Sequence, residues 1–125
     1  MLLAYGFLRK IFEIFEKYRT PIDMITTSEV AVSVTIDSDQ HLSGILQELG
    51  SFGLITVEKN QTIIAVVGNE IAQTQQILPK LFQSLSGIPV SMVSYGGSRH
   101  NISLLVPSPY KVQTLQALNA GLFGL

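Results

Sequence analysis

The stretch PIDMITTSEVAVSVTI at residues 21–36 recurs in altered form as PVSMVSYGGSRHNISLLV at residues 89–106. Proline, an aliphatic residue, methionine and a second aliphatic residue keep the same spacing in both stretches. Two additional residues in the second stretch then bring its later serines level with those of the first. A repeat at roughly 70 residues indicates two copies of one small structural unit. Within the match one position changes its chemistry, since Asp23 of the first copy is replaced by Ser91 in the second.

The composition limits the classes of protein that the chain can belong to. Its 125 residues suit one ordinary domain or two very small ones. Only 14% are charged, which on a short chain indicates that a partner covers some apolar surface, and the net charge of −1 argues against a nucleic-acid binder. No cysteine is present, so disulfides and thiolate chemistry are excluded. Without a signal peptide or an apolar run of about 20 residues, we expect a cytoplasmic protein with no membrane partner.

The first copy is expected to run helix, strand, strand, helix, strand. Apolar residues at helical spacing predict the helices, and alternating valines before residue 36 predict a strand. The expected elements are helices over 7–18 and 42–49 and strands over 21–27, 30–36 and 54–59, with a capping turn at 37–39.

The second copy is expected to run strand, helix, strand, strand, helix. A continuous apolar run at 63–67 predicts a central strand. Pro79 lies inside the expected helix 70–86 and should kink or split it. The remaining elements are strands over 89–95 and 100–106, a hairpin turn at Gly96 and Gly97, and a last helix that is capped at Ser108 and Pro109 and ends at Gly121.

The two copies together predict an α+β fold of two ferredoxin-like units of the βαββαβ type, with antiparallel sheets and helices on one face. We expect the units to be residues 1–60 and 61–125. Only residues 1–5 precede the first helix, so the first unit lacks most of its opening strand. A sheet that misses a strand exposes backbone hydrogen-bonding groups. The chain is therefore interpreted as a piece of a longer protein, or as a unit that a partner completes.

The sequence offers little for catalysis. It contains no phosphate-binding glycine motif, and Gly96 and Gly97 favour a turn over a phosphate site. His41 and His100 lack the spacing of metal ligands, so no metal site is predicted. We expect a protein that is not an enzyme by itself.

Asp23 is the candidate functional residue, because a carboxylate within an apolar strand needs hydrogen-bond donors, a cation or water. One interpretation is that Asp23 points to solvent or caps a loop; the other is that it receives the ammonium group of a ligand. The turn at residues 4–8 enters the first helix, and its backbone N–H groups suit an α-carboxylate. We expect Asp23 to lie beside this helix N-terminus. Glu29 is either a solvated charge or a partner for the side-chain ammonium of lysine.

At these residues the chain resembles the C-terminal regulatory part of aspartokinase, a tandem pair of ACT domains. The run Ile-Thr-Thr-Ser-Glu-Val at 25–30 is the most specific part of the match. The first copy adds Gly-Phe-Leu at 6–8, and the second adds Val-Gly-Asn at 67–69 and His-Asn at 100–101. The similarity covers essentially all 125 residues.

The resemblance implies that the ACT pair binds an end-product amino acid and allosterically inhibits a kinase that phosphorylates aspartate. The kinase domain would precede the ACT pair in the parent chain, and nothing here matches it. We therefore expect no cofactor for this chain, with ATP and magnesium needed only by the kinase domain. ACT units of the family associate side by side into dimers, with the effector at their interface.

The resemblance also assigns residues to effector binding. Asp23 would take the α-ammonium, the backbone of the turn before the first helix would contribute, and Ser91 would leave the second unit structural. The assigned residues are Met1, Ala4, Gly6, Phe7, Leu8, Pro21, Ile22, Asp23, Thr27, Ser28 and Glu29. Lysine is the favoured effector and threonine the second choice. The alternative is an ACT dimerisation module that binds no ligand.

Overall fold

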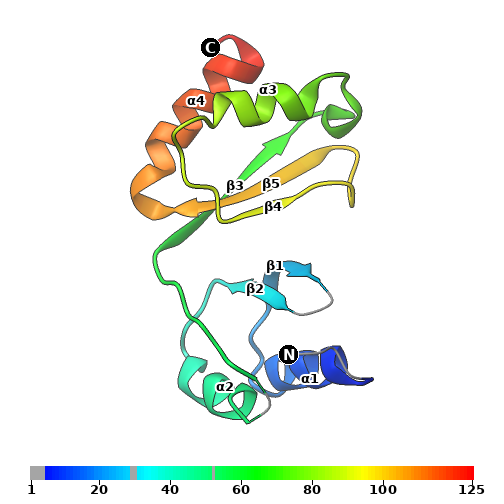
Figure 1. Cartoon of the computed structure of the whole chain (residues 1–125), viewed down its shortest axis with the longest axis vertical. Helices are drawn as coiled ribbons and strands as arrows, with labels where there is room; N and C mark the ends of the chain where they lie inside the picture. Colours follow the sequence, from blue (N-terminus) through cyan, green and yellow to red (C-terminus); the bar gives the residue numbers. More distant parts are fainter. Residues whose placement is uncertain (1–4, 29–30, 52) are drawn as a thin grey trace. The chain divides into compact units, whose positions relative to one another are not determined.

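The computed structural model describes residues 5–28, 31–51 and 53–125, and the chain divides into two compact units, residues 1–57 and 58–125 (Figure 1). Both units are mixed α/β with antiparallel sheets, as the repeat predicts. No described helix has both the length and the apolar character that crossing a membrane requires.

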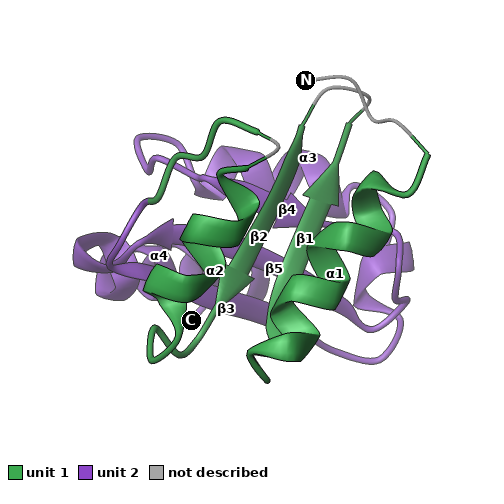
Figure 2. Cartoon of the chain, turned by 90° about the horizontal axis from the view of Figure 1, so that it is seen from below, with its two compact units in different colours: residues 1–57 green, residues 58–125 purple. Residues whose placement is uncertain are grey.

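The first unit packs two helices on one face of a two-stranded sheet (Figure 2). Its elements are α1 (Phe7–Lys17), β1 (Ile22–Thr27), β2 (Val32–Ile36) and α2 (Leu42–Leu49). Apolar side chains of both helices meet in a small buried cluster of Ile11, Ile14, Phe15 and Ile45.

The C-terminal end of α1 reverses the chain within four residues. The backbone N–H of Thr20 donates to the carbonyl of Phe15 at 2.9 Å, and Arg19 takes the left-handed conformation with φ 49°. Because a residue before proline is biased away from the helical region, Thr20 and Pro21 direct the chain into β1. The strand therefore starts beside the end of α1 and runs back along it.

Two expectations for the first unit are wrong, and a third concerns residues that the structure does not describe. Residues 54–59 are not a strand, because no described segment pairs with them; Leu54 is fully exposed. The residue that precedes α2 is His41 rather than the turn at 37–39, and no side-chain hydrogen bond caps this helix. The expected incomplete opening strand falls mainly on residues 1–4, outside the described residues.

The second unit has a three-stranded antiparallel sheet in the order β3-β5-β4, with α3 and α4 on one face (Figure 1). The central strand is β5, which pairs on both sides. The apolar run at 63–67, expected to be central, instead lies in β3 at the edge of the described sheet, where Ile64 faces Leu104 of β5. The core includes the fully buried side chains of Leu81, Ile102, Leu104 and Val106. The elements are β3 (Gln61–Val67), η1 (Ile71–Gln73), α3 (Ile77–Ser84), β4 (Met92–Ser94), β5 (Asn101–Pro107), η2 (Ser108–Tyr110) and α4 (Lys111–Phe123).

The expected helix over 70–86 is split, although not at Pro79. The break lies upstream, where Thr74 is extended and Gln76 has φ 66°. Pro79 is the third residue of α3, in the first turn, where its missing N–H has no intrahelical acceptor to lose.

Gly121 does not end the last helix. α4 continues to Phe123, and Gly124 provides the left-handed C-cap with φ 68°. Ser108 and Pro109 form a separate 3₁₀ turn, η2, before α4. Gly96 has φ 101° between β4 and β5, which confirms the expected turn there.

Candidate functional site

Asp23 lies at an irregularity of β1. Ile22 pairs with Ile36 and Ile25 with Val34, so three steps along β1 match two along β2. This extra residue is a β-bulge, a feature that re-aims side chains next to functional sites. The side chain of Asp23 is exposed, and no other described residue hydrogen-bonds to it or pairs with it.

The bulge has a side-chain anchor on the neighbouring strand. The backbone N–H of Met24 donates to Oγ1 of Thr35 at 2.9 Å. Met24 itself is buried, with 6% of its surface exposed. One hydroxyl of β2 thus holds the backbone that presents Asp23.

The turn before α1 has the features that suit an anion. Gly6 is the N-cap with φ 83°, and it has no side chain to satisfy the first turn of the helix. No acidic residue lies in this turn, and Leu8 is 37% exposed. Phe7 is half-buried and packs on the core, which fixes the start of the helix.

The structure does not bring Asp23 to this helix N-terminus, which corrects the expectation that they lie side by side. From Phe7 to Lys17 the helix advances by about 15 Å at 1.5 Å per residue. Asp23 follows the reversal at the far end, and β1 then runs back beside α1 (Figure 2). One free amino acid is too short to contact both ends of α1 in the same unit.

The other predicted site residues divide between the two ends. Thr27 ends β1, about 17 Å from Ile22 at 3.3 Å per residue, and so returns to the level of the α1 N-terminus. Ser28 follows it, and its backbone N–H donates to Ala31 at 2.8 Å. Pro21 and Ile22 remain with Asp23. Met1, Ala4 and Glu29 lie outside the described residues.

A hollow lies next to the Asp23 end, at the C-terminus of α1. Its lining includes Pro21 and also the cation Arg19, which is not among the predicted site residues. Arg19 immediately follows Lys17 and Tyr18, and this cluster of basic residues before Pro21 is the signal that would have drawn attention to it. The full lining is Phe15, Glu16, Arg19, Thr20 and Pro21.

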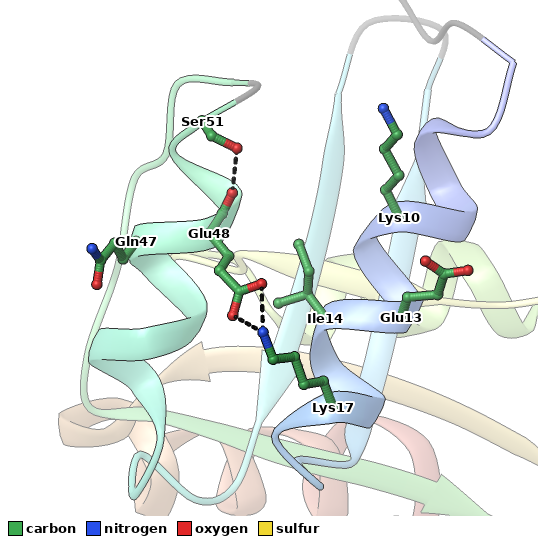
Figure 3. A pocket seen from close by; sticks show the side chains of 7 residues that line it. All are labelled: Lys10, Glu13, Ile14, Lys17, Gln47, Glu48 and Ser51. Atoms are coloured by element: carbon green, nitrogen blue, oxygen red, sulfur yellow. Dashed lines mark hydrogen bonds and ion pairs between the residues drawn. The ribbon is translucent and has the colours of Figure 1, made fainter.

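A second hollow separates α1 from α2 and contains none of the predicted site residues (Figure 3). Lys17 Nζ contacts both carboxylate oxygens of Glu48, at 3.0 and 3.1 Å, and the Tyr18 hydroxyl donates a short hydrogen bond to the same carboxylate. The bond from Tyr18, and then that from Lys17, lowers the pKa of Glu48. These contacts connect the C-terminal end of α1 with α2. It is lined by Lys10, Glu13, Ile14, Lys17, Gln47, Glu48 and Ser51.

The equivalent of Asp23 in the second unit is bonded within its own sheet. The Ser91 hydroxyl donates to Oε1 of Gln61 at 3.2 Å, and the Ser91 N–H donates to the Leu105 carbonyl at 2.7 Å. Ser91 carries no charge for an ammonium group. The described residues of both units contain no cluster of three or more side chains suited to a metal ion.

The sequence and the fold of the chain are both similar to those of known proteins. A family model described as the ACT domain matches residues 64–122. A putative C-terminal regulatory domain of aspartate kinase from Porphyromonas gingivalis W83 is 45% identical and has a TM-score of 0.86, covering 98% of this chain and 84% of that one. The chain belongs to the regulatory ACT domains of aspartokinases.

Two further relatives extend this assignment to complete aspartokinases. The lysine-sensitive aspartokinase 3 of Escherichia coli K12 is 32% identical over 98% of this chain and 29% of its own length. E. coli aspartokinase III in complex with lysine and aspartate has a TM-score of 0.82 at 32% identity, over 96% of this chain and 28% of that one. The chain thus spans less than a third of the length of these two relatives.

Proposed function

We propose that this regulatory region binds a free amino acid between two copies of the chain and so controls an attached or associated aspartate kinase. Asp23 of one copy takes the α-ammonium group. The turn at Gly6 of the second copy takes the α-carboxylate. In this proposal each two-fold dimer of the first unit contains two equivalent effector sites, because such an interface is self-complementary.

The separation of the two ends of α1 carries this proposal. The carboxylate of Asp23 suits the α-ammonium group of an amino acid, and the backbone N–H groups after Gly6 suit its α-carboxylate. The helix α1, about 15 Å long, separates these two groups within one unit. A second copy that lies antiparallel along the edge of the unit would bring its own helix N-terminus toward Asp23. An exposed carboxylate without a partner among the described residues is also available for a ligand.

Lysine is the proposed effector, with threonine second. Aspartokinase 3 of E. coli, a relative that is 32% identical, is described as lysine-sensitive, and a similar structure is a complex with lysine and aspartate. Glu29, which the sequence places six residues after Asp23, is the proposed partner of the lysine side-chain ammonium. Control of the kinase then depends on the difference in effector affinity between the active and inhibited arrangements.

Calorimetric titration of lysine and threonine against the full chain tests the proposal. We expect Asp23→Asn to weaken binding by about tenfold to a hundredfold, because a hydrogen bond to a charged group contributes about 1.5–3 kcal/mol. Ser91→Ala is the matched control from the second unit and should leave binding unchanged. Equal losses in both variants would contradict a single effector-binding unit.

The alternative function is an ACT dimerisation module without a ligand. It predicts a dimer by light scattering together with no heat of binding for any amino acid. The low charged fraction of 14% favours dimerisation under either function, because it leaves apolar surface to be covered. A cytoplasmic location stays a prediction from the sequence.

A further inference from the structure

The corner between β3 and η1 in the second unit is attached to the β4–β5 loop by several hydrogen bonds. The backbone N–H of Gly68 donates to the His100 carbonyl at 3.0 Å, and the N–H of Ala72 donates to the Arg99 carbonyl at 2.9 Å. The Tyr95 hydroxyl donates to the Ala72 carbonyl at 3.1 Å. The two backbone bonds hold the two ends of the corner without the help of a side chain.

Glu70, at the middle of the corner, is held by a titratable side chain. Its backbone N–H donates to Nδ1 of His100 at 2.7 Å. Glu70 has φ 53°, a left-handed conformation that is uncommon for a residue other than glycine. The contact with His100 therefore supports a backbone conformation that the residue by itself does not favour.

Only one protonation state of His100 can make this bond. In the neutral imidazole with its proton on Nε2, Nδ1 is an acceptor, whereas both nitrogens are donors in the protonated ring. Protonation would place an N–H of the ring against the N–H of Glu70. His100 is exposed to solvent, so protons reach it directly.

The charged groups at this junction come from both segments. Glu70 belongs to the corner and Arg99 to the loop, and their side chains approach at 3.7 Å between Oε1 and Nη1. Tyr95 from the loop is a hydrogen-bond donor here, and the Ser98 hydroxyl accepts the His100 N–H at 3.1 Å.

We propose that His100 is a pH-sensitive latch that holds the corner at Glu70 against the β4–β5 loop and releases it on acidification. The proton that the ring gains occupies the Nδ1 lone pair and removes the acceptor of the Glu70 N–H. Because only the neutral ring accepts this bond, the stabilising effect of the bond is lost when the ring becomes charged. The bonds of Gly68 and Ala72 remain, so the release is local.

Amide hydrogen exchange and imidazole NMR of the full chain test the latch. The chain has only two histidines, so in a His41→Gln background the remaining imidazole signal belongs to His100. We expect the neutral ring to carry its proton on Nε2. Protection of the Glu70 amide, corrected for intrinsic exchange, should fall several-fold with the same midpoint as that ring, while protection of the Ala72 amide stays constant.

Two variants separate the latch from a general loss of structure. His100→Asn keeps an acceptor oxygen near the place of Nδ1 and should protect the Glu70 amide at every pH between 5 and 8. His100→Ala should lose that protection throughout the range. A proton on Nδ1 at neutral pH would overturn the proposal. So would protection of the Glu70 amide that stays constant while the His100 ring titrates in the His41→Gln chain. Both results can be obtained even if His100→Ala fails to fold.

Discussion

Gly121 of α4 packs directly against Ser84 at the end of α3. A Cβ placed on Gly121 would lie 1.8 Å from the Ser84 hydroxyl oxygen and 2.7 Å from its Cβ. Ser84 has little freedom to move away, because its hydroxyl donates to the Lys80 carbonyl at 2.6 Å. The closeness of the two helices therefore depends on the absence of a side chain at residue 121.

Gly121→Ala should destabilise the second unit by about 1–3 kcal/mol, the usual cost of overpacking, despite the better helix propensity of alanine. Denaturant unfolding followed by circular dichroism measures the change. Adding Ser84→Gly should recover part of the loss through the coupling of the two sites. Gly97→Ala is the control, since nothing lies within 4 Å of a Cβ there; an equal loss in the control would disprove the packing argument.

The stability of the first unit should fall in acid through Glu48. Hydrogen bonds from Tyr18 and Lys17 lower the pKa of this carboxyl in the folded state. A group with a lowered folded pKa stabilises the fold above its unfolded pKa, and this contribution is lost as the pH falls through the folded value. The window lies below the ordinary value near 4.5.

Comparison of the wild type with Glu48→Gln across that window measures the effect. We expect the wild type to be more stable at pH 7, and the two curves to converge as the pH falls through the lowered pKa of Glu48. Glu13→Gln is the matched control, because among the described residues Glu13 pairs only with Arg9, on the exposed face of α1. A gap that is independent of pH would mean that the Glu48 charge is not responsible.

Mixing two variants that each bind the effector weakly should restore tight binding in part if the site is divided between copies. A chain with Asp23→Asn retains its Gly6 turn, and a chain with Gly6→Val retains its Asp23. In a random mixture, half of the dimers combine the two and contain one intact site, so about a quarter of the wild-type sites should return. Titration calorimetry of the mixture after exchange of subunits gives this number. No recovery, with heterodimers verified by mass spectrometry, would place the whole site in one copy.

Thr35→Val should weaken the bulge that presents Asp23. The valine has nearly the same shape but leaves the Met24 N–H without its acceptor at 2.9 Å. We expect a loss of stability of about 1–2 kcal/mol and a weaker effector response. Thr35→Ser retains the hydroxyl and should keep both. Normal effector affinity in Thr35→Val would show that the hydroxyl is unnecessary for the presentation of Asp23.

Most helices and strands could be predicted from periodicity, because alternating or helical spacing of apolar residues directly reflects one buried face. The absence of a strand at 54–59 could not be predicted, because this segment is rich in residues with high strand propensity, whereas a strand also needs a paired neighbour. The role of Gly121 could not be predicted for a related reason. A glycine near a helix end has the same sequence signature whether it caps the helix or allows another helix to approach.

The sequence by itself determined that the chain repeats one α/β unit, that only the first copy carries Asp23, and that the motif resembles aspartokinase regulatory domains. Only the tertiary structure decided where Asp23 lies relative to the α1 N-terminus. From Phe7 to Lys17 the helix α1 extends over about 15 Å, and the chain reversal after Lys17 then directs β1 back along it. Asp23 and the turn at Gly6 therefore lie at opposite ends of α1. This separation is the reason why the proposed site is divided between two copies.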